Sequence, residues 1–283
     1  MQCDIDILGE PSNLAEIELI LATTALLGKL DFKNFTIRIN DRRFLKAMAA
    51  FSGFKEEDFD EVFIILDKMD KIGKEGVGEE LVEMGYTKEN VDTYLGLFDE
   101  INPDVDGIRF CKEKLAGFLD EKTADSMEMI ISSVESAKEA DFKVKFDPTL
   151  VRGQSYYTGT IFEVTMDEFG GSVAGGGRYD KMIGKFTGQD TPACGFSIGF
   201  ERIFSILMQN GVETKASADK IAVMYDEGQV KEAYVIAEKY RAEGKVCSLY
   251  VKPKKMGKFL GKLEERGYKG FVNVSNGDEI SLF

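Results

Sequence analysis

Two segments of the chain carry an arginine beside residues that could help to bind an anion. In 151–160, Arg152 is followed by two adjacent tyrosines and flanked by glycines. In 195–202, small and apolar residues alternate up to Glu201 and Arg202, which begin a predicted helix. The helix dipole opposes a cation at that end, so Arg202 needs an anionic partner or solvent, and a nucleotide phosphate or a glutamate would serve equally. Arg152 by itself is more typical of a surface ion pair.

A third segment, 174–180, has three consecutive glycines before Arg178 and Tyr179. Glycines let another group approach the backbone closely, but taken alone this run favours a tight turn. It matches neither the GxGxxG pattern of dinucleotide-binding folds nor a P-loop. The tyrosine pair, Tyr156 and Tyr157, predicts opposite orientations on a strand, one side chain lining a pocket while the other packs.

The amino-acid composition excludes several catalytic mechanisms. The 283-residue chain contains no histidine, so neither a Ser-His-Asp triad nor a Cys-His pair can form. Its four cysteines occur singly, which predicts reduced thiols, no zinc or other metal site, and a cytoplasmic location. The first residues do not resemble a secretory signal, and no apolar stretch approaches the ~20 residues that span a bilayer.

Charge is unevenly distributed along the chain. The net charge is −14, but residues 220–283 hold 12 basic and 9 acidic residues, a balance of +3, which leaves −17 for the rest. Within this tail, Lys254, Lys258 and Lys262 recur every four residues along a predicted helix. A solvated lysine face is the simpler interpretation, and contact with a nucleic-acid backbone is the alternative.

Hydrophobic periodicity predicts the elements that position these segments. Alternating residues predict strands at 2–8, 35–40, 142–146, 160–165 and 172–174. Their glycine turns favour an antiparallel sheet. Asn13 with Glu16 resembles a capping box, which predicts a helix that ends at Gly28. Asp41 is the expected N-cap of a second helix, which runs through Phe51.

The rest of the chain predicts an insertion and a second domain. Short acidic helices are expected over about 54–140, where no residue pattern indicates chemistry. The polar stretch 210–218 is the expected linker between a first domain, 1–209, and a small α/β domain, 219–283. In the tail, strands are expected at 221–225, 246–251 and 270–274, and helices at 230–242 and 254–266.

The three segments, in this order and spacing, resemble the histidyl-tRNA synthetases, a family of class II aminoacyl-tRNA synthetases. Arg-Gly-x-x-Tyr-Tyr-Thr-Gly and Gly-Gly-Gly-Arg-Tyr-Asp resemble its two histidine-specific motifs, and Gly-Phe-Ser-Ile-Gly-Phe-Glu-Arg its motif 3. Residues 2–9 resemble the end of motif 2, 39–43 another common segment, and the tail the anticodon-binding domain. The resemblance implies an α+β fold, with an antiparallel class II catalytic sheet, a helical insertion and an anticodon-binding-like α/β domain.

The resemblance also implies an activity, the formation of histidyl-adenylate from L-histidine and ATP with Mg²⁺, followed by transfer to tRNA(His). Arg152 matches the catalytic arginine that contacts the α-phosphate, and Arg202 the motif 3 arginine that holds ATP. The histidine-binding positions of the family match Gln2, Asp6, Tyr156, Tyr157, Arg178 and Tyr179. Fixed guanidinium groups would offset the repulsion between the histidine carboxylate and the phosphate. The lysines of the tail would then contact RNA.

The sequence departs from the family pattern in several places. It begins inside motif 2, so we expect the arginine of that motif, and motif 1, to lie upstream in a longer protein. Full-length members are homodimers through motif 1, and we expect this chain alone not to form adenylate at a useful rate. Gln154 and Ser155 stand where many members have Leu-Asp. We also expect the final elements of the family's tail to be missing from this sequence.

Two other functions are compatible with the same resemblance. One is a catalytically silent paralogue such as the histidine-sensing regulatory subunit of ATP phosphoribosyltransferase. That relative usually lacks an anticodon-binding domain, so the tail argues against it, as do Arg152 and Arg202. The other is a module that binds RNA or a partner protein and has lost its ATP site.

Overall fold

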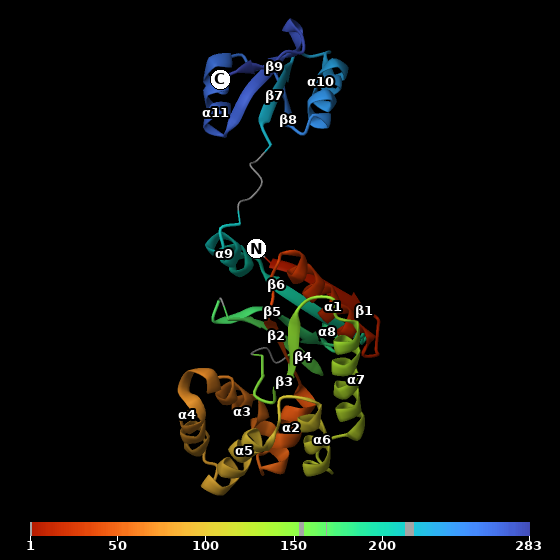
Figure 1. The fold of residues 1–283 in the computed structure, drawn as a ribbon, viewed down its shortest axis with the longest axis vertical. Coiled ribbons are helices and arrows are strands. Elements are labelled where there is room, and N and C mark those ends of the chain that lie inside the picture. Colours follow the sequence, from red (N-terminus) through yellow and green to blue (C-terminus); the bar gives the residue numbers. More distant parts are fainter. Residues whose placement is uncertain (1, 153–155, 168, 213–217) are drawn as a thin grey trace. The chain divides into compact units, whose positions relative to one another are not determined.

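The computed structural model describes residues 2–152, 156–167, 169–212 and 218–283. They form two compact units, Met1–Gln209 and Asn210–Phe283 (Figure 1). The predicted linker overlaps this boundary, but its residues 213–217 lie outside the described residues. Among the described helices, none combines the length and apolarity needed to cross a membrane.

A six-stranded sheet with the order β1-β6-β5-β4-β2-β3 forms the centre of the first unit. Its strands are β1 (Gln2–Leu8), β2 (Phe35–Asp41), β3 (Phe142–Phe146), β4 (Thr160–Met166), β5 (Gly171–Arg178) and β6 (Ala193–Gly199). The antiparallel expectation is confirmed for every neighbouring pair except β2 and β3, which run parallel. This exception arises because a long helical crossover joins β2 to β3 and lets the chain enter both from the same end.

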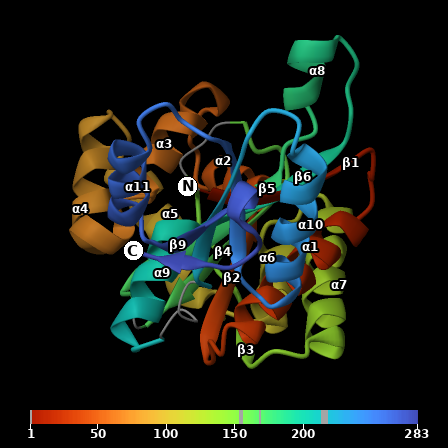
Figure 2. The same ribbon diagram turned by 90° about the horizontal axis from the view of Figure 1, so that it is seen from above.

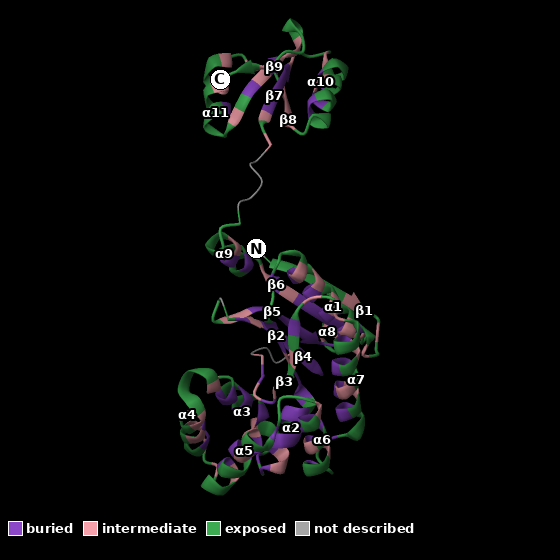
Figure 3. Cartoon of the chain, viewed as in Figure 1, coloured by how far each residue is buried: buried purple, intermediate pink, exposed green. Residues whose placement is uncertain are grey.

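The two faces of this sheet differ in chemistry because side chains alternate along each strand. One face is apolar and includes Ile39, Phe162 and Phe196, which are all buried in the core. Buried residues predominate along the strands that carry them, β2, β4 and β6 (Figure 3). The rings of Phe162 and Phe196 pack across the sheet with centroids 4.6 Å apart. On the other face, the paired residues Glu163, Gly175 and Ser197 form a polar row across β4, β5 and β6.

Helix α1 (Leu14–Lys29) covers the apolar face, and its start differs from the prediction. Asn13 makes no side-chain cap, and Glu16 does not reach back to it, because the Glu16 carboxylate is buried and binds Arg178. The helix also continues through Gly28 to Lys29. The predicted capping box is therefore wrong, although the helix itself is confirmed.

A helical layer follows β2. Asp41 caps α2 (Arg42–Phe51) as predicted, accepting a hydrogen bond from the Arg43 N–H at 2.8 Å. Residues 54–140 are helical, as expected: η1 (Glu56–Asp58), α3 (Phe59–Leu66), α4 (Met69–Glu83), α5 (Lys88–Glu100), α6 (Val105–Lys114) and α7 (Glu121–Ala137). Helices α3, α4 and α5 lie side by side (Figures 1 and 2). Two short helices come later, α8 (Met182–Thr187) after β5 and α9 (Phe200–Gln209) after β6.

The second unit is a four-stranded sheet with the order β10-β9-β7-β8 and two helices. Its elements are β7 (Lys220–Tyr225), α10 (Val230–Ala242), β8 (Val246–Val251), α11 (Met256–Glu265), β9 (Tyr268–Asn273), η2 (Val274–Asn276) and β10 (Ser281–Leu282). Val223 packs with α10, whereas its neighbour Met224 packs in a separate cluster with Leu263 of α11. Alternation along β7 thus places the two helices on opposite faces. The short strand β10 was not predicted.

Candidate functional site

A cavity of about 770 Å³ opens on the polar face of the six-stranded sheet. It is lined by seven of the predicted site residues: Gln2, Asp6, Arg152, Tyr156, Tyr157, Tyr179 and Arg202. These residues come from β1, the segment before β4, the end of β5 and the start of α9. Four segments that are far apart in the sequence therefore meet around one space. Arg178 is not among the residues that line it.

Strand β1 provides a row of polar side chains to this cavity. Gln2, Asp4 and Asp6 all line it, because residues two apart on a strand point to the same face. Asp6 is paired with Gly195 of β6, and a Cβ on that glycine would lie 2.0 Å from the Asp6 Oδ1. Glycine at 195 therefore leaves the space that the carboxylate occupies.

The triple glycine lies inside β5 and is not a turn, so that prediction is wrong. The predicted close approach is confirmed, because a Cβ on Gly175 would lie 1.8 Å from the Arg152 Nη1. At Gly176, a Cβ would lie 1.9 Å from the carbonyl oxygen of Gly195. Glycine is needed at both positions because neighbouring groups occupy the space that a side chain would take.

The aromatic side of the cavity holds three tyrosines. Tyr156 and Tyr157 do not point to opposite sides as predicted, since they precede β4 and are not on a strand. Both line the cavity, with hydroxyl oxygens 3.3 Å apart. The Tyr156 ring meets the Tyr179 ring edge-on at 6.0 Å.

The Tyr179 hydroxyl donates a hydrogen bond to the Asp6 carboxylate. Burial raises the pKa of Tyr179, and this hydrogen bond raises it further. Burial also raises the pKa of Tyr156. These phenols therefore keep their protons at neutral pH and can act as hydrogen-bond donors.

The two arginines of the cavity are held in different ways. Arg152 has a left-handed backbone conformation, with φ of 52°, and its Nη1 donates to the Glu163 carboxylate at 3.2 Å. Arg202 is exposed and donates from Nη1 to the carbonyl oxygen of Ser172 at 2.6 Å, with its guanidinium 5.9 Å from the Phe169 ring centre. The helix dipole opposes a positive charge at Arg202, and the Ser172 carbonyl offsets part of this effect. Arg202 also lines the cavity, where an anion could bind it.

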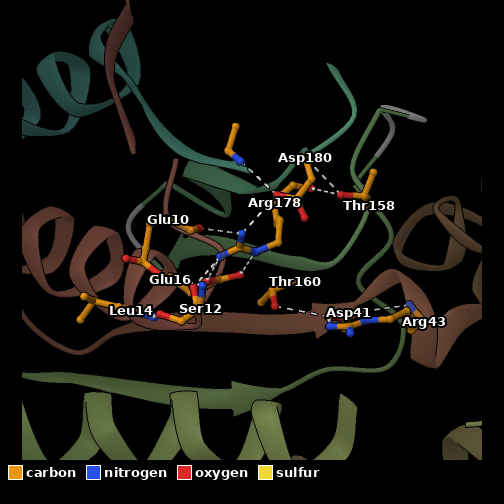
Figure 4. Close-up of polar contacts among 11 residues, drawn as sticks. Glu10, Ser12, Leu14, Glu16, Asp41, Arg43, Thr158, Thr160, Arg178 and Asp180 are labelled. Carbon is orange, nitrogen blue, oxygen red and sulfur yellow. Dashed lines mark hydrogen bonds and ion pairs between the residues drawn. The ribbon is translucent and has the colours of Figure 1, made fainter. Parts of the chain in front are cut away.

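Arg178 lies on the opposite face of the sheet, where Figure 4 shows its contacts. It forms a two-pronged ion pair with Glu16, with both nitrogen–oxygen distances at 2.6 Å. Its other N–H groups donate to the Glu10 carbonyl at 3.1 Å, the Ser12 carbonyl at 2.8 Å and the Asp180 carboxylate at 3.1 Å. All five guanidinium donors therefore have partners. Burial opposes the Arg178 charge, yet the bonds to Glu16 raise the pKa of this guanidinium.

Two acidic residues at or near the site were missed in the sequence. Glu16 occupies a position of the apolar face of its helix, three and four residues before the buried Leu19 and Ile20. An acid at such a position indicates a buried partner. Glu163 alternates with the buried residues Phe162 and Val164, which places it on the polar face of β4 but does not reveal its partner.

Other predicted features lie outside this cavity. Lys254, Lys258 and Lys262 are exposed, but α11 begins at Met256, so Lys254 precedes the helix. Of the four free cysteines, Cys3 alone is exposed. Within the described part of the chain, no group of three or more potential metal-binding side chains clusters, and the absence of zinc stays a prediction. Residues 154 and 155 lie outside the described residues.

The sequence is similar to that of known proteins. A family model described as histidyl-tRNA synthetase matches residues 1–203. A histidine–tRNA ligase of Leifsonia xyli is 37% identical over 281 residues, which cover 97% of this chain and 64% of that protein. The chain thus spans less than two thirds of that relative.

Two solved structures share the fold. Histidyl-tRNA synthetase from Nostoc sp. superposes with a TM-score of 0.68 at 24% identity, covering 95% of this chain and 65% of that one. A protein from Bacillus halodurans, described as an ATP phosphoribosyltransferase regulatory subunit/histidyl-tRNA synthetase, gives 0.64 at 21% identity, covering 96% and 67%.

Proposed function

Since residues 1–203 match its family model, the chain belongs to the histidyl-tRNA synthetase family, and from this premise we propose that it carries the histidine- and ATP-binding site of a histidine–tRNA ligase. The whole protein would activate L-histidine with ATP, as its magnesium complex, and transfer it to tRNA(His). The observation that carries this proposal is the single cavity that Arg152, Arg202 and the Tyr179–Asp6 pair share.

Adenylate formation requires two anions to meet. A carboxylate oxygen of histidine attacks the α-phosphorus of ATP, a new phosphorus–oxygen bond forms, and pyrophosphate leaves with the electron pair of the bond that breaks. The carboxylate is already deprotonated, so no general base is needed. Arg152 and Arg202 would offset the repulsion and stabilise the charge that develops, and the fixed cavity would align both reactants.

The other end of the cavity suits an imidazole. Tyr156, Tyr157 and Tyr179 offer ring faces and hydroxyl groups, while Asp6 offers a carboxylate oxygen that can accept from a ring N–H. Gln2 lies on the same row as Asp6 and would contact the polar backbone groups of histidine. We propose that Arg178 acts indirectly, by fixing the end of β5 next to Tyr179.

The tail would supply contacts with RNA. In this proposal, Lys258 and Lys262 of α11, with Lys254 just before it, face the phosphate backbone of tRNA(His). The whole protein would act as a homodimer. A cytoplasmic location stays a prediction.

The alternative is a histidine sensor without ligase activity. The Bacillus halodurans protein is described in terms of both kinds of protein, so this fold is compatible with either. That match covers 96% of this chain, so it includes the second unit, and the second unit does not separate the two functions. Arg152 and Arg202, which line the same cavity, favour the ligase. A sensor would bind histidine tightly without any nucleotide.

Calorimetry with a sulfamoyl analogue of histidyl-adenylate tests the proposal directly. We expect this chain to bind the histidyl analogue and to bind the alanyl analogue at least about tenfold more weakly, because the latter leaves polar groups of the pocket unpaired. Asp6→Asn should remove most of this preference. Equal affinity for the two analogues would contradict the proposal, and tight binding of free histidine alone would favour the sensor.

Catalysis by this chain alone is a separate question. Because the chain spans 64% of the Leifsonia relative, we propose that it does not catalyse histidine-dependent pyrophosphate exchange at a useful rate by itself. Rapid exchange by the purified chain would refute this part of the proposal but not the assignment of the site.

A further inference from the structure

The Glu163 carboxylate lies between two arginines on the polar face of the sheet. Its Oε2 accepts from the Arg152 Nη1 at 3.2 Å, and its Oε1 accepts from the Arg38 Nη1 at 3.5 Å. Arg38 is anchored in turn by Asp147, whose carboxylate accepts from the Arg38 Nε at 2.6 Å. Side chains of Arg38, Glu163 and Arg152 are only 16–23% exposed, so solvent screens these contacts less than it screens a surface pair.

The backbone around Glu163 provides space for the same guanidinium. Glu163 is paired with Gly175 across β4 and β5, and a Cβ at 175 would collide with the Arg152 Nη1. The guanidinium therefore occupies the position where any other residue would place a side chain. Arg152 also has a φ of 52°, which is unfavourable for a residue other than glycine and persists only where surrounding contacts hold it.

We propose that Glu163 is a positioning residue, which holds the Arg152 guanidinium over Gly175 so that it faces the α-phosphate of the bound nucleotide. This inference rests on the proposed function, because it assigns the anion that Arg152 meets. An unrestrained arginine side chain samples many rotamers, and fixing it beforehand removes that entropic cost from nucleotide binding. A guanidinium has five N–H donors, so one contact with Glu163 leaves donors for a phosphate. Arg38 keeps the carboxylate from turning towards solvent.

Two roles of Glu163 predict opposite results when its charge is removed. If Glu163 only neutralises Arg152, Glu163→Gln makes the cavity more positive and strengthens binding of any anion. If Glu163 holds the guanidinium in place, the same change weakens the contact with the α-phosphate although the net charge becomes more favourable. The sign of the change therefore separates a positioning role from a counter-charge.

Binding of AMP and adenosine to the full chain gives this measurement, since the two ligands differ by the α-phosphate. We expect Glu163→Gln to reduce the preference for AMP about tenfold, the scale of one charge-assisted hydrogen bond. Asp70→Asn is the matched control: it removes a carboxylate 3.6 Å from the same Arg38, but Asp70 is 77% exposed and should leave the preference unchanged. An increased or unchanged preference in Glu163→Gln would overturn the proposal. A fold defect would weaken the binding of AMP and of adenosine equally, so it would not change the preference for AMP.

A second measurement does not depend on nucleotide binding. Arg152 and Glu163 also line a smaller cavity of about 230 Å³, through which a small reagent can reach the guanidinium. Modification by phenylglyoxal, followed by mass spectrometry, should be faster at Arg152 in Glu163→Gln than in the wild type or Asp70→Asn. Gly175→Ala, which keeps every charge, should have the same effect by displacing the guanidinium.

The two measurements distinguish the failures. A wild type with no preference for AMP would contradict the proposed function, while faster modification would still show that Glu163 holds Arg152. Unchanged modification in both Glu163→Gln and Gly175→Ala would overturn the positioning role itself.

Discussion

Replacing Glu16 with glutamine is expected to destabilise the first unit by about 3 kcal/mol. Glu16 is fully buried and Arg178 is 7% exposed, and two 2.6 Å bonds join them. Glutamine keeps the shape but removes the charge, which leaves Arg178 with Asp180, 39% exposed, as its remaining carboxylate partner. Breaking a buried pair in this way costs about 3–5 kcal/mol. The amide oxygen can still accept one bond, so the lower end of this range applies.

Urea denaturation monitored by hydrogen exchange in peptides from α1 measures this loss without a contribution from the second unit. With a slope of about 1–3 kcal/mol per molar urea, the midpoint should fall by about 1–3 M. Glu18→Gln is the matched control, because Glu18 is on the same helix but exposed. It should change the free energy of unfolding by no more than about 0.5 kcal/mol.

A double variant tests the electrostatic reason. Glu16→Leu with Arg178→Met removes both charges, and we expect it to be more stable than Glu16→Gln, because an apolar pair leaves no unpaired buried charge. A loss below about 1 kcal/mol in Glu16→Gln would refute the reasoning, since it would mean that water or movement of the chain compensates Arg178.

Three further outcomes follow from the structure. Burial and Asp6 raise the pKa of Tyr179 above its ordinary 10.0, so the unfolded phenol loses its proton first; the urea midpoint should decrease as the pH rises above about 10, and Tyr179→Phe should reduce this decrease. Cys3 is exposed, and burial raises the pKa of Cys111 to about 12, so Ellman's reagent at neutral pH should label Cys3 quickly and Cys111 only on unfolding. Lys258→Glu should weaken tRNA(His) binding and lower its salt dependence, whereas Lys231→Glu, an equal change on α10, should not.

Local patterns in the sequence predicted most elements, and the resemblance to the histidyl-tRNA synthetases indicated the residues that gather at the cavity. Alternation identified the strands, and a capping aspartate, Asp41, identified the start of α2. Pairing between distant residues could not be predicted in the same way. Glu16 and Arg178 are 162 residues apart, and the short-range signal at Glu16, a glutamate three residues after Asn13, favoured a cap. The cap was wrong because a buried guanidinium binds a carboxylate more strongly than a backbone N–H at the surface does.

The glycines of β5 and β6 show why such partners leave a trace even where they cannot be named. A glycine inside a strand weakens it, so its presence needs a reason at that position. At Gly175 the reason is the Arg152 guanidinium, and at Gly195 it is the Asp6 carboxylate, each supplied by a distant segment. The space at each position is matched to a charged group from another strand or loop. Gly175 and Gly195 therefore mark the positions where two charged groups of the cavity are held, and the chemistry of each position depends on the residue that fills it.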